Sequence, residues 1–287
     1  MASTSSRSLP VNETFLSYRE WPGEKGPLLC LPSFAGHKGS FQRLAERLSP
    51  EYRLIALDLR GRGDSGKPQQ GYGFAYHARD ILALLQQLDI ERFAIIGHSF
   101  GATVGTYLAS IRPDRVSAIV LLEGGADPTE AVLEAIRPSL AHLESRFPSM
   151  RDYLEAMRKL PWYRAGWGDA LEAYLRQDVQ RQADGTVSPK ADANALRHDL
   201  DLHFLYSMCL HFPALQCPAL FVRAGDGLLG GDRGHIFSEA ETDAIVRWIP
   251  KGRRLDMPGV NHFTLLLHDD PPVSEPVRRF LQQALAR

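Results

Sequence analysis

Hydrophobic positions in the first 125 residues alternate between two spacings. Residues 14–21 alternate apolar and polar side chains, and short apolar runs follow at 27–31, 52–57, 93–96 and 116–122. Between these runs, apolar residues recur every three or four positions, as at Ile81, Leu84, Leu85 and Leu88, which is the period of a helix with one buried face. Short buried strands separated by such helices predict βαβ units around a mostly parallel sheet.

The pattern changes after Gly125. Between 128 and 212 the chain has helix-like stretches and no strand-like run; the stretches are 131–143, 150–160, 169–179 and 191–210, with a turn at Asp184-Gly185. The alternation then resumes with a strand at 219–222, a helix at 239–248, a strand at 254–257 and a closing helix at 273–286. We therefore expect a core formed by residues 1–127 and 213–287, interrupted by a helical cap formed by 128–212.

Composition narrows the class of protein. Of the 287 residues, 44% are hydrophobic and 23% are charged, which is typical of a soluble globular protein. The net charge of −1 shows no basic excess for nucleic acid. No apolar run approaches the roughly 18 residues that span a bilayer, and residues 1–7 lack the apolar segment of a secretory signal. We expect a cytoplasmic protein whose partner is a small molecule; the sequence does not determine its oligomeric state.

Three cysteines, Cys30, Cys209 and Cys217, lie far from any CxxC spacing. In a cytoplasmic protein such a sparse, odd set predicts reduced thiols and no zinc site.

The segment with the strongest chemical signal is Gly97-His98-Ser99-Phe100-Gly101. It places G-x-S-x-G between the apolar strand ending near 96 and a helix expected from Ala102. A sharp turn in this context raises a serine hydroxyl above the sheet, and the glycines leave out side chains that would collide there. The helix N-terminus beneath the turn directs backbone N–H groups towards a developing oxyanion.

Three further segments complete a family pattern. Residues 52–65 contain Asp58-Leu-Arg60-Gly-Arg62-Gly-Asp-Ser, residues 27–36 lead into Ser33-Phe34, and Val260-Asn261-His262-Phe263 lies near the C-terminus. Their order and spacing resemble the α/β-hydrolase superfamily over about residues 10 to 285. The resemblance implies a mostly parallel, roughly eight-stranded sheet with helices on both faces and an inserted helical cap, and it implies chemistry without a metal or organic cofactor.

The residue at the turn separates branches of that superfamily. Haloalkane dehalogenases and epoxide hydrolases carry an aspartate there, whereas this chain has Ser99. A serine attacks acyl carbons and needs a general base. Among ten histidines, His262 follows the last strand, where the order Ser, acid, His places the base. By contrast, four histidines have polar, surface-like neighbours: His77, His142, His198 and His268.

The acid that would orient His262 has two candidates. Asp226 follows the strand at 219–222, which is the commoner position in the family, but it arrives one residue early for the usual spacing. Glu123 ends the strand neighbouring the one that carries Ser99, and some relatives, including certain lactonases, place their acid there. A carboxylate at an apolar strand end needs a partner such as an imidazolium. We favour Glu123 and keep Asp226 as the alternative.

The oxyanion hole is expected from the backbone N–H groups of Phe100, the residue after the nucleophile, and Phe34 in the loop after the first core strand. Here the chain has Pro32-Ser33 where most relatives have His-Gly. Five side chains are expected to contact substrate: Ser33, His37, His98, Trp162 and Trp167.

These features predict a serine hydrolase that cleaves carboxylic esters through an acyl-serine intermediate. Two alternatives use the same residues. One is a lactonase acting on cyclic esters, and the other is a ligand receptor that retains the triad but turns over slowly.

Overall fold

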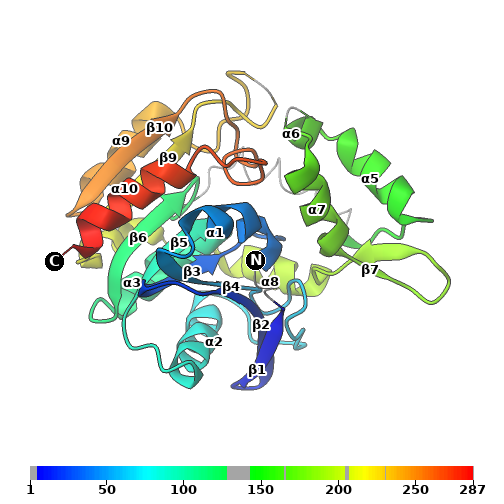
Figure 1. The fold of residues 1–287 in the computed structure, drawn as a ribbon, viewed down its shortest axis with the longest axis horizontal. Coiled ribbons are helices and arrows are strands. Elements are labelled where there is room, and N and C mark those ends of the chain that lie inside the picture. Colours follow the sequence, from blue (N-terminus) through cyan, green and yellow to red (C-terminus); the bar gives the residue numbers. More distant parts are fainter. Residues whose placement is uncertain (1–4, 128–142, 165, 204–206, 230, 287) are drawn as a thin grey trace.

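The computed structural model describes residues 5–127, 143–164, 166–203, 207–229 and 231–286. Its centre is an eight-stranded sheet in the order β1-β2-β4-β3-β5-β6-β9-β10 (Figure 1). The strands are β1 (Arg7–Val11), β2 (Thr14–Trp21), β3 (Lys25–Leu31), β4 (Tyr52–Leu57), β5 (Phe93–His98), β6 (Val116–Leu122), β9 (Ala219–Ala224) and β10 (Gly252–Met257). β1 and β2 are antiparallel to their neighbours, and the six strands from β4 to β10 are parallel.

Helices cover both faces of the sheet, because its central strands carry apolar side chains on both sides. Leu29 and Leu31 of β3 face one layer, while Leu28 and Cys30 face the other. α2 (Phe74–Gln87), α3 (Phe100–Ile111) and α9 (Glu239–Trp248) form the first layer; α1 (Gln42–Leu48) and α10 (Ser274–Leu285) form the second. A short 3₁₀ helix, η1 (Lys38–Phe41), precedes α1. The expected fold class is confirmed.

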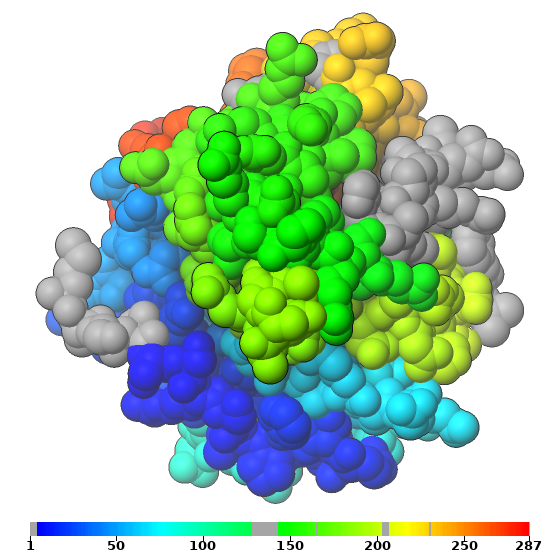
Figure 2. Space-filling model, turned by 90° about the vertical axis from the view of Figure 1, so that its right-hand side faces the viewer, coloured from blue at the N-terminus to red at the C-terminus, as the bar shows by residue number. Residues whose placement is uncertain are grey.

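Residues 128–212, here called the insertion, interrupt the alternation of sheet strands and helices. They contain α5 (Met150–Arg158), α6 (Pro161–Arg164), α7 (Asp169–Asp178), β7 (Val179–Arg181), β8 (Val187–Pro189), α8 (Ala193–His203) and a 3₁₀ turn, η2 (Met208–Leu210); another, η3 (Phe212–Ala214), follows. In Figure 1, α5, α6, α7 and β7 lie together beside the core. In Figure 2 they occupy the middle of the face turned to the viewer.

The expectation that the insertion holds no strand was wrong. β7 and β8 pair antiparallel, and Gly185, at φ +85°, lies in the turn between them, so the Asp184-Gly185 turn lies between α7 and α8 as expected but closes a hairpin. The helix expected at 131–143 lies outside the described residues except for Leu143. Among the helices of the described segments, none is long and apolar enough to cross a membrane.

Candidate active site

Ser99 lies at the carboxyl end of β5, on the turn into α3. Its backbone adopts φ 53° and ψ −121°, a combination that residues other than glycine rarely adopt. The turn is held because the Ser99 N–H donates to Leu122 O at 2.8 Å and Ser99 O accepts from Ala102 N–H at 2.9 Å. Side chains at both flanking glycines would collide with backbone: a Cβ on Gly97 would lie 2.4 Å from the Ala102 Cα, and one on Gly101 would lie 2.1 Å from Leu31 O. The motif therefore forms the sharp strand-to-helix turn that its glycines predict.

Glu123 lies at the matching position on the neighbouring strand. His98 of β5 pairs with Leu122 of β6, so the residues after each, Ser99 and Glu123, leave the sheet side by side. Glu123 also has a positive φ, 49°, and its N–H donates to Val222 O at 2.9 Å. Among the described residues other than glycine, only two besides Ser99 and Glu123, both outside this site, share such a backbone. Local strain is thus concentrated at the end of β5 and β6.

His262 comes to the same edge from the loop after β10. Its Nδ1 lies 3.6 Å from Glu123 Oε2, and the side chain is buried. This distance is longer than a hydrogen bond, as catalytic contacts often are without substrate. Glu123 Oε1 accepts from the Ala224 N–H at 2.7 Å, which fixes the carboxylate against the imidazole. Of the two acid candidates, Glu123 is therefore the one that faces His262.

Asp226 lies elsewhere. Its backbone N–H donates to Val260 O at 2.9 Å, and its side chain borders a pocket of about 420 Å³ between the insertion and the loop that carries His262. Trp167 and Asn261 border the same pocket. No described contact within 4.0 Å joins the Asp226 carboxylate to His262.

Burial shifts both members of the Glu123–His262 pair towards their neutral forms. Loss of water raises the pKa of Glu123 from 4.5 to about 7, although the Ala224 N–H opposes this shift. Loss of water also lowers the pKa of His262 from 6.5 to about 4. At neutral pH the imidazole is uncharged and able to accept a proton, and Glu123, whose pKa lies near this pH, is beside it to stabilise the positive charge once it forms.

Asn261 fixes the loop that carries the histidine. Its side-chain oxygen accepts from the N–H groups of Phe263 and Thr264, at 3.0 and 2.9 Å. Its side-chain nitrogen donates to Trp162 O in α6 at 3.2 Å, and so it joins this loop to the insertion. Asn261 was not predicted as a site residue; its position beside His262 was the available signal, since a buried asparagine in a turn bonds to nearby backbone.

Phe34 and Phe100 lie together beside Ser99. Their rings meet edge to face at a centroid distance of 5.3 Å. Among the described residues, none accepts a hydrogen bond from the backbone N–H of either residue. Neither N–H is therefore engaged within the described residues, and that of Phe100 lies at the N-terminus of α3.

His37 and His98, both expected to contact substrate, form contacts with the protein itself. His98 is buried, and its Nε2 lies 2.9 Å from His262 O, so it supports the loop of His262. His37 stacks on Tyr174 of α7 at 4.3 Å, with Nε2 on Tyr174 O at 3.2 Å and Nδ1 on the Gly39 N–H at 3.1 Å. Both imidazoles are engaged with the protein because each lies between two packed segments.

The other three residues expected to contact substrate are Ser33, Trp162 and Trp167. Ser33 is half-buried in the turn before Gly36, whose N–H donates to Ser33 O. Trp162 is half-buried in α6 near the His262 loop. The guanidinium of Arg158 lies 4.5 Å from the ring of Trp167, and Trp167 borders the pocket that Asp226 also lines.

The position of His77 also differs from the one predicted from the sequence. Its polar neighbours predicted a surface position, but the ring is buried and Nε2 lies 2.9 Å from Asp199 of α8. The nearby Arg60 and Arg62 are buried as well, each paired with a carboxylate, Asp80 and Asp199 respectively. Both arginines of the loop after β4 are therefore held by buried ion pairs.

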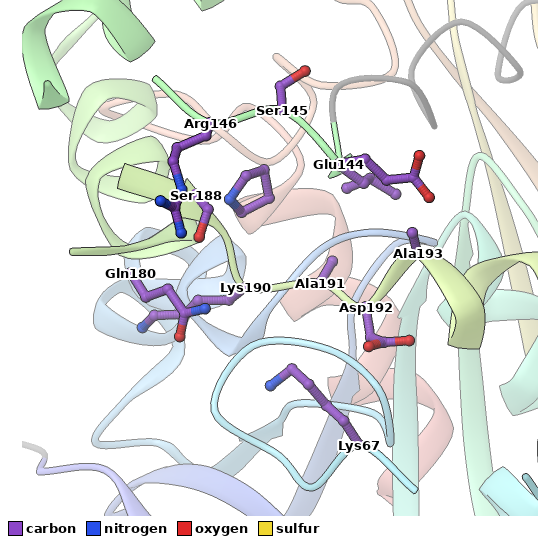
Figure 3. A pocket seen from close by; sticks show the side chains of 12 residues that line it. Lys67, Glu144, Ser145, Arg146, Gln180, Ser188, Lys190, Ala191, Asp192 and Ala193 are labelled. Atoms are coloured by element: carbon purple, nitrogen blue, oxygen red, sulfur yellow. The ribbon is translucent and has the colours of Figure 1, made fainter. Parts of the chain in front are cut away.

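A second pocket, of about 330 Å³, lies between the insertion hairpin and Lys67 (Figure 3). Charged side chains line this pocket, and most of them are already paired: Lys190 with Asp64, Arg146 with Asp184, and Glu144 with Arg197. None of its lining residues belongs to the Ser99–His262–Glu123 group.

Comparison with known proteins identifies the family. The family model described as alpha/beta hydrolase fold matches residues 26–269. The chain belongs to this family. It is 33% identical to a serine hydrolase-like protein of Danio rerio over 96% of this chain and 87% of the relative. It is 30% identical to the 2-(acetamidomethylene)succinate hydrolase of Mesorhizobium japonicum, over 90% of this chain and 88% of that one.

Solved structures agree on the fold. The crystal structure of E-2-(acetamidomethylene)succinate hydrolase superposes with a TM-score of 0.85 over 97% of this chain and 99% of that one, at 22% identity.

Another relative by sequence, 30% identical over 84% of this chain and 86% of its own length, is the putative carbamate hydrolase RutD of Klebsiella pneumoniae strain 342. The family and these relatives make the chain a hydrolase.

Proposed function

We propose that the chain is a serine hydrolase that cleaves carboxylic esters through an acyl-serine intermediate. The observation that carries the proposal is the shared edge of β5 and β6, where Ser99 follows the strained turn and Glu123 faces His262 at 3.6 Å. Ser99 is the nucleophile, His262 the base and Glu123 the acid. A carboxylate against Nδ1 fixes the tautomer that leaves Nε2 as the proton acceptor.

The reaction follows from these roles. Ser99 Oγ attacks the carbonyl carbon, and its proton passes to His262 Nε2. The tetrahedral oxyanion accepts hydrogen bonds from the N–H groups of Phe34 and Phe100. The C–O bond to the leaving alcohol then breaks, and the alcohol takes the proton from His262. Water, deprotonated by His262, attacks the acyl-serine; the acid leaves, and Ser99 regains its proton.

The insertion serves in this proposal as a cap over the site. Two contacts support it: Asn261, next to His262, donates to Trp162 O, and His37, in the loop after β3, stacks on Tyr174 of α7. A cap held at both loops excludes water from the reacting groups and shapes the pocket for the acyl or alcohol part.

A second candidate substrate class is an acyl C–N bond. The relatives named as a putative carbamate hydrolase and as a 2-(acetamidomethylene)succinate hydrolase favour it, since both names describe substrates in which a carbonyl group is attached to nitrogen. A lactone is the third class, because ring opening of a cyclic ester uses the same steps.

One experiment tests the function and sorts the classes. The protein is treated with a fluorophosphonate, and the labelled peptide is located by mass spectrometry, with Ser99→Ala as the control. Initial rates are then measured on p-nitrophenyl acetate and butyrate, γ-butyrolactone, a phenyl carbamate and an N-acyl enamide. We expect labelling at Ser99 and highest kcat/KM on the esters. Labelling elsewhere, with Ser99→Ala fully active, contradicts the proposal; highest kcat/KM on the carbamate or enamide moves the substrate to the C–N class.

A further inference from the structure

Arg62 has no role in the proposed reaction steps. Its side chain is fully buried between the two rings of the expected oxyanion hole: the guanidinium carbon is 5.5 Å from the ring centre of Phe34 and 5.3 Å from that of Phe100. Its Nε donates to Phe34 O at 3.0 Å. One side chain thus contacts both residues whose N–H groups would hold the oxyanion, and it fixes the peptide that follows Phe34.

Arg62 is itself held by the insertion. Its Nη1 lies 2.5 Å from Asp199 Oδ2 on α8, and both side chains have no exposed surface. Asp199 also accepts from the Gly73 N–H at 2.6 Å and contacts His77 Nε2 at 2.9 Å. The His77 ring in turn meets the edge of Phe100 at 5.5 Å. Two of the three partners of this carboxylate, Arg62 and His77, therefore contact Phe100 directly.

α8 is seated on this part of the core by close packing as well. The Asp192 N–H, just before α8, donates to Gly61 O at 2.8 Å. A Cβ on Gly61 would lie 2.3 Å from the Ala195 Cβ, so only glycine allows α8 to approach the loop so closely. Leu196 of α8 belongs to a small apolar cluster that Phe34 joins from the core. The position of α8 and the position of the Phe34 loop consequently depend on the same packing contacts.

We propose that Asp199 and Arg62 are positioning residues, through which docking of α8 sets the geometry of the oxyanion hole. The inference rests on the proposed function, since it assigns Phe34 and Phe100 to the hole. A guanidinium neutralised by Asp199 keeps its planar fork fixed between the two rings, and a fixed donor geometry is what stabilises an oxyanion. When α8 is displaced or Asp199 is uncharged, Arg62 loses its anchor and the two N–H groups no longer converge.

The chain offers a matched control two residues away. Arg60, on the same loop as Arg62, forms another buried ion pair with Asp80 of α2, with Arg60 Nε 2.6 Å from Asp80 Oδ2. Arg60 stacks on Tyr76 and bonds to Gly71 O; it has no described contact with Phe34 or Phe100. Loss of either pair leaves a buried charge without a partner and weakens the fold. Only the Arg62 pair lies against the oxyanion hole.

The test compares Asp199→Asn with Asp80→Asn, and Arg62→Gln with Arg60→Gln, on a p-nitrophenyl ester. We expect Asp199→Asn and Arg62→Gln to lose about 10- to 100-fold in kcat with little change in KM, as when one oxyanion donor is misplaced. The rate constant for fluorophosphonate labelling of Ser99 should fall by a similar factor, because that step also passes through an oxyanion. Asp80→Asn and Arg60→Gln should melt earlier but keep kcat within about threefold.

Two further readouts separate positioning from general damage. The acid limb of the pH profile should keep its midpoint in Asp199→Asn, because the Glu123–His262 pair is untouched. The double variant Asp199→Asn/Arg62→Gln should lose no more kcat than Arg62→Gln alone, since Asp199 acts through Arg62. Should any of these variants fail to fold, Arg62→Lys, which retains the charge but not the planar fork, gives the same comparison against Arg60→Lys.

Equal losses of kcat in both pairs would overturn the inference, as would unchanged labelling and turnover in Asp199→Asn. If the unaltered protein is not labelled at Ser99, the proposed function fails instead. The two failures are therefore distinguishable in one set of measurements.

Discussion

At the scale of single residues, two carboxylates after neighbouring strands have different environments. Glu123 is buried, receives the Ala224 N–H and faces His262, whereas Asp226 lines an outer pocket. A buried carboxylate next to an imidazole stabilises the imidazolium that forms during proton transfer, and one at a distance does not. The order of the strands in the sheet produces this difference, because β6 lies directly beside the strand that carries Ser99.

Glu123→Gln is expected to reduce kcat on the order of ten-thousand-fold, because the amide keeps the volume of the acid but not its charge. Asp226→Asn should stay within about tenfold of the parent. Steady-state rates on one ester substrate, with active-site titration to count folded protein, give the comparison. The reverse order would assign the acid to Asp226, and a collapse in both would mean that one network includes both carboxylates.

The same residue should make stability depend on pH. Burial raises the pKa of Glu123 from 4.5 to about 7, so the folded state binds this proton more tightly than the unfolded state. Stability from this group is fully present below pH 4.5 and is lost as the pH rises to about 7, a loss of about 3 kcal/mol. Glutamine does not titrate. Urea unfolding from pH 4.5 to 8 should show Glu123→Gln gaining about that much relative to the parent.

Ser99→Ala is the control for that measurement, since it is inactive but retains Glu123. Its stability relative to the parent should be the same at both ends of the pH range. A flat difference between Glu123→Gln and the parent would mean that the carboxyl is not buried in solution as it is in the structure.

Sequence spacing predicted Ser99 and Glu123 because each follows a strand whose apolar run is visible, and it predicted His262 from its place after the last strand. It misplaced His77, which lies among polar residues yet is buried against Asp199, 122 positions along the chain. A pairing over such a distance leaves no local pattern. The engagement of His37 with Tyr174 was hidden for the same reason, since it depends on how the insertion folds back.

At the scale of elements, the core strands and helices were predictable because each is long enough to show its period. β1, β7 and β8 were not. β1 is an edge strand, Arg-Ser-Leu-Pro-Val, with mostly exposed or half-buried side chains and a proline, while β7 and β8 have three residues each. In such short or exposed strands, pairing with a neighbour determines the structure and the hydrophobic pattern does not.

The two tryptophans of α6 and the following turn should have different effects. Trp162 lies in α6, tied through its carbonyl to Asn261 beside His262, while Trp167 stacks under Arg158 and borders the outer pocket. We expect Trp162→Ala to shift the preferred acyl chain length of p-nitrophenyl esters. Trp167→Ala should lower the melting temperature and leave the preference unchanged. Equal shifts in both, or earlier melting alone in both, would contradict this assignment.

At the scale of the whole molecule, the sheet keeps two of the three thiols from solvent. Cys30 on β3 and Cys217 before β9 are buried, and burial raises the pKa of Cys217 to about 11; Cys209 is exposed. The thiolate is the reactive form, so buried, protonated thiols react slowly. Both buried cysteines belong to the two apolar layers that flank the sheet. Their exposure requires that those layers open.

An aromatic disulfide reagent should therefore modify one thiol per chain rapidly and the other two only on unfolding. Absorbance of the released thiolate, followed with and without urea, measures both phases. Cys209→Ser should abolish the fast phase and leave the slow phase unchanged. Rapid reaction of a second thiol in the native protein would show that one of the layers opens readily.

The position of Glu123 has a consequence for recombination. Ser99 and Glu123 lie on one uninterrupted β5–α3–β6 piece that ends before residue 128, and only His262 lies beyond residue 212. An insertion exchanged between relatives as a single cassette, with crossovers near 128 and 212, would therefore leave all three groups on the recipient. Arg62, however, stays in the recipient, whereas its partner Asp199 is removed together with the recipient's own insertion. A donor cassette without a carboxylate at that point of α8 leaves a buried guanidinium uncompensated. Successful chimeras should be enriched in cassettes that bring one.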